Sequence, residues 1–209
     1  MKKTDLLRAE LGRDFSSITA ARREKLETLA DYITDKFRNG QRPALLIICT
    51  HNSRRSHLCQ ILAAFAADCY QLPHIDTYSG GTEATAFNPR AVRALRTAGF
   101  RIDCEDESAE NPVYKISWGT EQTPLPAFSK VYDSKPNPTE NFAAIPVCSE
   151  ADAGCPIVAG CDFRLALPYD DPKAFDATKE EEFAYLAKIT EIGREMFYVM
   201  QRVSEKLNC

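Results

Sequence analysis

Cys49 and Arg55 bound the stretch of the sequence that is best suited to chemistry, Cys-Thr-His-Asn-Ser-Arg-Arg. A loop of this length can direct its backbone N–H groups toward a tetrahedral anion, and a guanidinium can bind two oxygens of that anion side by side. The same positive field favours the thiolate of Cys49, which is the nucleophilic form. The spacing therefore predicts an oxyanion-binding loop with a cysteine nucleophile. The alternative is a buried cysteine at a strand end beside an exposed arginine.

The residues that follow the cysteine are candidates for the oxyanion site. Asn52 and Ser53 can form local hydrogen bonds, and the hydroxyl of Ser56 can stabilise the thiolate. His51 either tunes the loop or bonds to the backbone, while Arg54 either widens the positive potential at the entrance or is solvated. We expect oxyanion-binding contacts from Thr50, His51, Asn52, Ser53, Arg54, Arg55 and Ser56.

A strand and a helix are predicted on either side of this loop. Residues 43–49 are almost continuously apolar, as in a parallel strand that is buried on both faces. In residues 55–67 the apolar side chains recur at helical spacing, at Leu58, Ile61, Leu62 and Phe65. The loop would thus lie at a helix N-terminus, whose partial positive charge also attracts an anion.

Strands and helices alternate along most of the chain. Further strands are expected at residues 74–79, 142–148 and 163–167, with a helix at 89–98 and a long amphipathic helix from Thr178 onward. This alternation predicts an α/β fold with a mostly parallel sheet. A chain of 209 residues is long enough for one such domain with additions.

Two segments are predicted as additions to this domain. Residues 1–40 read as an N-terminal helical extension, with N-caps at residues 16–19 and a stop at Asn39-Gly40. Residues 41–209 form the main domain, which carries an insertion near 112–140. In that insertion, prolines interrupt two possible strands at 113–118 and 128–132.

Composition excludes several classes of protein. The net charge of −4 gives no general attraction for a polyanion, so nucleic acid is not expected as a partner. The longest apolar run, residues 61–67, is far too short to span a membrane, and no signal-peptide core follows Met1. We expect a cytoplasmic protein whose eight cysteines are largely reduced, and hence either buried or reactive.

Cys148 and Cys155 form a second cysteine pair, separated by the polar stretch Ser-Glu-Ala-Asp-Ala-Gly. A disulfide requires Cα atoms within about 7 Å, so this pair closes only if the intervening stretch bends or unwinds. The alternative is two packed cysteines without a redox role. A metal site formed with Cys161 is disfavoured because no fourth ligand is evident, and we expect neither a metal nor another cofactor.

The motif of residues 49–56 resembles the signature loop of the low-molecular-weight protein-tyrosine-phosphatase superfamily, and Thr-His-Asn-Ser is more similar to its thioredoxin-coupled arsenate reductase branch. The phosphatase branch usually has glycine where His51 stands. The resemblance continues in residues 78–83, in Asn88-Pro89 and in residues 147–172, and it covers most of the chain from residue 43 onward. It implies a three-layer sandwich with a central, mostly parallel four-stranded sheet flanked by helices.

The resemblance also implies roles for individual residues. Asp171, next to proline in Asp-Asp-Pro, matches the general acid of the family, and Cys49 and Arg55 match its nucleophile and anion-binding arginine. Cys148 and Cys155 match the pair that relays a disulfide outward from the nucleophile. An arsenate reductase of this kind takes arsenate as its oxyanion and is restored by thioredoxin or a similar dithiol protein.

Two other functions remain open from the sequence. A phosphatase would use Cys49, Arg55 and Asp171 through a phosphocysteine, on a phosphoprotein or a small phosphoester. Residues 173–175 lack the tyrosines that phosphotyrosine phosphatases of the family carry there. A non-catalytic module would bind phosphate or arsenate and a protein partner, without chemistry.

Overall fold

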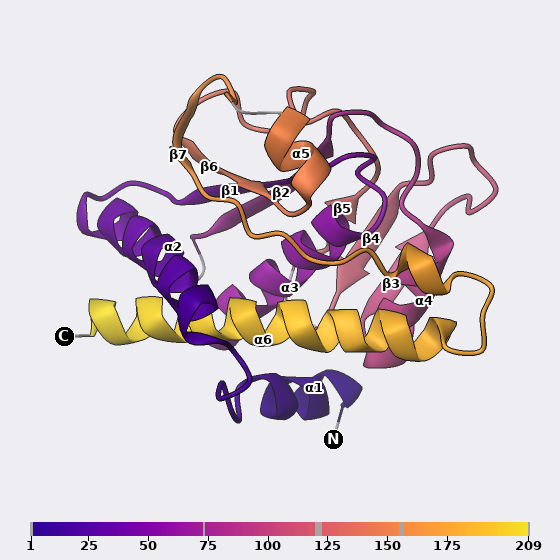
Figure 1. Ribbon diagram of the computed structural model, residues 1–209, viewed down its shortest axis with the longest axis horizontal. Helices are drawn as coiled ribbons and strands as arrows, with labels where there is room; N and C mark the ends of the chain where they lie inside the picture. Colours follow the sequence, from indigo (N-terminus) through magenta and orange to yellow (C-terminus); the bar gives the residue numbers. More distant parts are fainter. Residues whose placement is uncertain (1, 73, 120–122, 155–156, 209) are drawn as a thin grey trace.

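A four-stranded parallel sheet forms the centre of the protein in the computed structural model, which describes residues 2–72, 74–119, 123–154 and 157–208 (Figure 1). The strand order is β2 (Asp76–Gly81), β1 (Ala44–Cys49), β6 (Phe142–Pro146) and β7 (Cys161–Arg164). All neighbouring strands are parallel. This confirms the predicted α/β fold with a four-stranded sheet flanked by helices.

β1 lies between two neighbours, and this position explains its composition. Leu45, Leu46, Ile47 and Ile48 are all almost completely buried, as expected where helices and loops cover both faces of a parallel strand. β1 pairs with β2 up to Cys49 and Gly81, and with β6 up to Ile48 and Pro146. Because parallel strands end at one edge of the sheet, the chain segments after β1 and after β6 emerge side by side.

Helices α3 (Arg55–Cys69) and α6 (Glu181–Leu207) form the main helical layer below the sheet in Figure 1. α3 packs against β1 and β2, and α6 packs against α3, α2 and α4 (Pro89–Ala98). Two short helices stand close to the end of the sheet, α5 (Ser149–Gly154) and the 3-10 turn η1 (Pro172–Phe175). Among the described helices, none is both long enough and apolar enough to cross a membrane.

The N-terminal residues form two helices, α1 (Lys3–Leu11) and α2 (Ala20–Arg38). The hydroxyl of Thr19 accepts a hydrogen bond from the N–H of Arg22 and so caps α2, as the sequence predicts. The buried face of α2 presents Leu26, Leu29 and Ile33 to the common core. α2 lies against α6 (Figure 1), so this part of the chain shares the core of the sheet domain.

The segment between α4 and β6 forms a second, antiparallel sheet of β3 (Arg101–Cys104), β4 (Tyr114–Ser117) and β5 (Leu125–Ala127). The predicted strand at 113–118 is confirmed as β4. The one predicted at 128–132 is wrong, because β5 lies just before it and includes Pro126, which an edge strand tolerates. Ser129 and Lys130 instead hydrogen-bond to the loop after β1, and Lys130 and Tyr132 hydrogen-bond to Gly81.

Candidate active site

The loop after β1 exposes its N–H groups because its carbonyl groups are held from outside. The carbonyls of Cys49, Thr50 and Ser53 accept hydrogen bonds from the N–H groups of Thr82, Glu83 and Asn88. The carbonyl of His51 accepts from the hydroxyls of Thr85 and Ser129. In a planar trans peptide the C=O and the following N–H point in opposite directions. The N–H groups of residues 50, 51, 52 and 54 therefore face the inside of the loop, where an anion would be bound.

Gly81 is the residue that allows β2 to approach this loop. A Cβ atom at position 81 would lie 2.7 Å from the nitrogen of Asn52 and 2.7 Å from the carbonyl oxygen of Thr50. Contacts this short cannot be relieved without moving the backbone of the loop. Only glycine is therefore compatible with the close packing that holds the carbonyls outward.

Asn52 fixes the interior of the loop. Its backbone φ is +44°, a left-handed conformation that asparagine adopts more readily than most residues, and it is completely buried. Its Oδ1 accepts a hydrogen bond from the N–H of Lys130 at 2.9 Å, and its Nδ2 donates to Oγ of Ser56 at 2.8 Å. The Oγ of Ser56 lies 3.0 Å from Sγ of Cys49. Since Ser56 already accepts from Asn52, its own proton is available for the sulfur.

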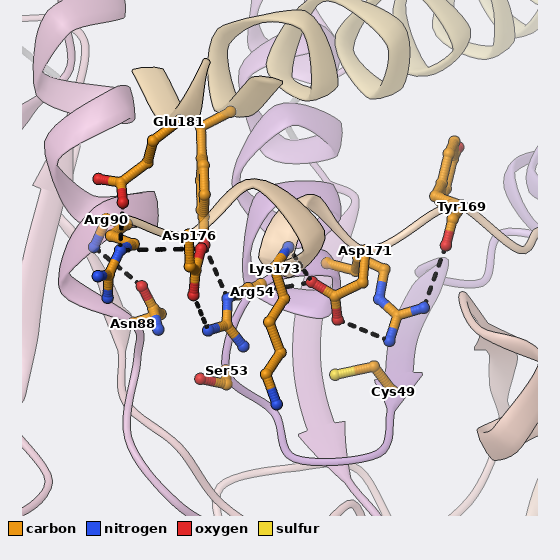
Figure 2. Close-up of polar contacts among 12 residues, drawn as sticks. Cys49, Ser53, Arg54, Asn88, Arg90, Tyr169, Asp171, Lys173, Asp176 and Glu181 are labelled. Carbon is orange, nitrogen blue, oxygen red and sulfur yellow. Dashed lines mark hydrogen bonds and ion pairs between the residues drawn. The ribbon is translucent and has the colours of Figure 1, made fainter. Parts of the chain in front are cut away.

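Arg55 and Asp171 form the other side of the site; Figure 2 shows Asp171 near Cys49. Nη2 of Arg55 lies 2.9 Å from Oδ2 of Asp171, and Nη1 donates to the carbonyl oxygen of Tyr169 at 3.1 Å. Oδ1 of Asp171 accepts from the N–H of Lys173 and so caps η1. These contacts hold Asp171 at the mouth of the loop, in a cavity of about 590 Å³ that Thr50, His51, Arg55 and Asp171 help to line.

Arg54 also lies near Asp171, with its Nε 4.0 Å from Oδ1 of that residue, but its shorter contacts are to other residues. Its Nη2 donates to Asp176 at 2.9 Å and its Nε donates to the hydroxyl of Tyr185 at 2.8 Å. Tyr185 in turn donates to Asp176, while the adjacent Arg90 is paired with Glu181 (Figure 2). The positive charge of Arg54 is thus largely neutralised within the protein. Arg54 forms part of the cavity wall, and its predicted contact with an oxyanion stays a prediction.

The remaining loop residues divide by orientation. The hydroxyl of Ser53 donates to the carbonyl of Ala86, away from Cys49, whereas His51 is exposed and lines the cavity.

Five residues that contribute to the site were not predicted from the sequence: Tyr169, Asp176, Tyr185, Ser129 and Lys130. Only Tyr169 carried a usable signal, because it directly precedes the Asp-Asp-Pro motif. Among the described residues, no group of three His, Cys, Asp or Glu side chains could hold a metal ion.

Cys148 lies beside this loop. It follows β6, the neighbour of β1, and its Sγ is 3.6 Å from Oγ1 of Thr50, the residue after Cys49. Its side chain is completely buried, and the sulfur accepts a hydrogen bond from the N–H of Ala151 in α5. The structure thus brings the second cysteine to the oxyanion loop. Cys155, its predicted partner, lies outside the described residues.

His57 is a buried histidine directly behind the loop. Its Nδ1 is 2.9 Å from Oγ of Ser79 and 3.5 Å from Nδ2 of Asn52. Complete burial, together with the nearby charge of Lys130, lowers the pKa of His57 well below its ordinary value. Burial also lowers the pKa of Lys130, to about 8. His57 is therefore neutral in the folded protein and supports the loop through packing and hydrogen bonds.

Comparison with known proteins identifies distant relatives. No family model matches the chain. A protein from Bacillus licheniformis named arsenate reductase is 28% identical over 158 residues, which cover 73% of this chain and 91% of the relative. One of the same name from Bacillus subtilis is 25% identical over 154 residues, with the same coverage of 73% and 91%. The chain is a distant homologue of proteins named arsenate reductase.

Solved phosphatase structures resemble the chain more loosely. A low-molecular-weight phosphotyrosine phosphatase from Vibrio cholerae has a TM-score of 0.48 and 13% identity, and the match covers 76% of this chain and 95% of that one. An arginine phosphatase from Geobacillus stearothermophilus has a TM-score of 0.44 and 17% identity, with coverage of 79% and 93%.

Replacement of Ser56 tests the hydrogen bond to the sulfur. A hydrogen bond to a charged group contributes about 1.5–3 kcal/mol, so we expect Ser56→Ala to slow the alkylation of Cys49 by iodoacetamide at pH 7 roughly tenfold or more. Ser53→Ala is the matched control, because it removes a hydroxyl of the same loop that points toward Ala86. Equal rates in wild type and Ser56→Ala would show that the hydroxyl does not stabilise the thiolate.

The buried His57 predicts a pH dependence of stability. Because its folded pKa lies below the unfolded value near 6.5, the unfolded chain takes up the proton first as the pH falls. The contribution of His57 is complete above pH 6.5 and decreases below it, by up to about 1.4 kcal/mol per pH unit. Urea unfolding between pH 7 and pH 5 should show a shallower decrease for His57→Gln. Parallel curves for the two proteins would contradict a neutral His57.

Proposed function

We propose that this protein reduces arsenate to arsenite, with Cys49 as nucleophile and Cys148 and Cys155 as a thiol relay. The observation that carries the proposal is the position of Cys148 beside Thr50, at the edge of the sheet where Cys49 also ends its strand. A phosphatase of this type requires one thiol. A second thiol against the same loop is what a disulfide relay requires.

The first step forms a bond between sulfur and arsenic. Arsenate is bound by the inward N–H groups of the loop and by the guanidinium of Arg55. Its oxygens replace the carboxylate of Asp171 as a partner of that guanidinium. The thiolate of Cys49 attacks arsenic, and one arsenate oxygen leaves as water. Asp171 at the mouth of the loop supplies the proton for that oxygen.

The second step reduces the arsenic. The thiolate of Cys148 attacks Sγ of Cys49, and a disulfide between them forms. The bond between sulfur and arsenic breaks, and its electron pair stays on arsenic, which passes from the +5 to the +3 state. Arsenite is released, and the two electrons have come from the two thiols.

The third step restores Cys49. The thiolate of Cys155 attacks Cys148, which frees Cys49 and forms a disulfide between Cys148 and Cys155. A dithiol protein such as thioredoxin then reduces that disulfide and becomes oxidised itself.

This last exchange requires a change in α5. A helix rises about 1.5 Å per residue, so an intact helix would hold the Cα atoms of Cys148 and Cys155 about 10 Å apart. That exceeds the limit of about 7 Å for a disulfide, so we expect the stretch between the two cysteines, which includes α5, to bend or unwind. Arg164 holds the present conformation, because its Nη2 contacts both the carbonyl oxygen and the carboxylate of Asp152. We expect this contact to break during the relay.

Replacement of each relay cysteine tests the proposal. We expect Cys148→Ser and Cys155→Ser to lower thioredoxin-dependent arsenate turnover to background, while Cys49 stays reactive toward iodoacetamide. Cys104→Ser is the control, because Cys104 is a free cysteine on β3, outside the site. Arsenite formation is measured under multiple-turnover conditions.

Two results would count against the relay. Undiminished arsenate turnover in both variants would exclude roles for Cys148 and Cys155. Hydrolysis of phenyl phosphate that survives Cys148→Ser but not Cys49→Ser, without arsenite formation by the wild type, would identify the protein as a phosphatase instead.

A further inference from the structure

Tyr169 connects the oxyanion loop to helix α6. Its main-chain carbonyl accepts the hydrogen bond from Nη1 of Arg55. Its side chain is buried, and its hydroxyl donates to Oε2 of Glu195 in α6 at 2.6 Å. The main chain of Tyr169 is thus bonded to Arg55 at the oxyanion loop, and its side chain is bonded to Glu195 in α6. The position of the carbonyl that binds Arg55 depends on how firmly the side chain is held.

Arg22 of α2 holds the partner of that side chain. Its Nε and Nη2 donate to different carboxylate oxygens of Glu195, each at 2.9 Å. This bidentate geometry fixes both the position and the orientation of the carboxylate. The guanidinium also lies 4.7 Å from the centroid of the Tyr169 ring. Both charged side chains are mostly buried, with exposed fractions of 17% for Arg22 and 10% for Glu195.

Removal of Arg22 would leave a buried carboxylate without its counter-ion. Such a group is strongly unfavourable, and it relaxes by rotating toward water or by taking up a proton. Either response changes the hydrogen bond from Tyr169. Tyr169 also stands two residues before Asp171 in the chain, so its displacement would move both groups that contact the guanidinium of Arg55.

We propose that Arg22, in the N-terminal extension, is a positioning residue for the oxyanion site that acts through Glu195 and Tyr169 on Arg55. Arg22 touches neither Cys49 nor the bound anion in this scheme. The inference rests on the proposed function in one respect only, that Arg55 binds the oxyanion. It assigns the extension a part in anion binding, in addition to its packing against α6.

The experiment uses inorganic phosphate as the probe on the full-length protein. The rate at which iodoacetamide alkylates Cys49 is measured at increasing phosphate concentration, which gives a dissociation constant from the protection. We expect Arg22→Gln to weaken phosphate binding about tenfold, which corresponds to ~1.4 kcal/mol. Arg22→Lys keeps the charge but loses the paired hydrogen bonds, so its dissociation constant for phosphate should lie between those of the wild type and Arg22→Gln.

Glu27→Gln is the matched control. Glu27 lies on the same helix as Arg22 and pairs with Arg202 and Lys206 of α6, at the same interface but without contact to Tyr169. We expect it to lower the midpoint of urea unfolding while phosphate binding stays within twofold of the wild type. Tyr169→Phe, which removes only the hydroxyl, should weaken phosphate binding severalfold and covers the case in which Arg22→Gln does not fold.

The outcomes separate the two claims. Unchanged phosphate binding in Arg22→Gln or, where that variant does not fold, in Tyr169→Phe would overturn the role of Arg22, as would an equal loss in Glu27→Gln. Absence of any phosphate protection in the wild type would overturn the oxyanion site itself, and with it the proposed function.

Discussion

The candidate site depends on one constraint, that the carbonyl groups of the loop after β1 are bonded outward. The hydrogen bonds come from the segment after β2 and, through Ser129, from the segment between β5 and β6. They leave the opposite edge of each peptide free for an anion. Asn52 completes the arrangement, because its buried amide links Lys130 to Ser56 and thereby directs a hydroxyl proton to Cys49. A buried thiolate needs such donors, because burial alone disfavours the charged form.

Segments outside β1, its loop and α3 therefore contribute specific contacts at or near the site. The segment between β5 and β6 supplies the main-chain N–H of Lys130 and the hydroxyl of Ser129. α6 supplies Glu195, and α2 supplies the arginine that neutralises it. Parallel pairing of β1 with β6 supplies Cys148. Each of these contacts joins residues that are far apart in the chain. The geometry of the loop therefore depends on the correct packing of several distant segments.

The sequence predicted those parts of the fold and of the site that follow from local patterns. The apolar run of β1, the helical spacing after Arg55 and the cap at Thr19 all depend on neighbouring residues, and the structure has them where expected. Contacts across the fold left no such pattern. Lys130 stands 78 positions from Asn52, and its side chain gives no sign that its backbone is the donor. Arg54 and Arg55 are adjacent in the sequence, yet Arg54 pairs with Asp176 and Arg55 pairs with Asp171. The strand expected at 128–132 is wrong for the same reason, since the backbone of Lys130 bonds to Asn52 and to Gly81, which are distant in the chain.

We propose that an oxyanion bound over Cys49 is reduced with electrons from the neighbouring thiols. The most direct measurement is disulfide mapping by mass spectrometry after the reduced protein has been exposed to arsenate without a reductant. We expect a disulfide between Cys148 and Cys155 in the wild type, and one between Cys49 and Cys148 in Cys155→Ser. A protein that binds arsenate and releases no arsenite, with all three thiols still free, would contradict it.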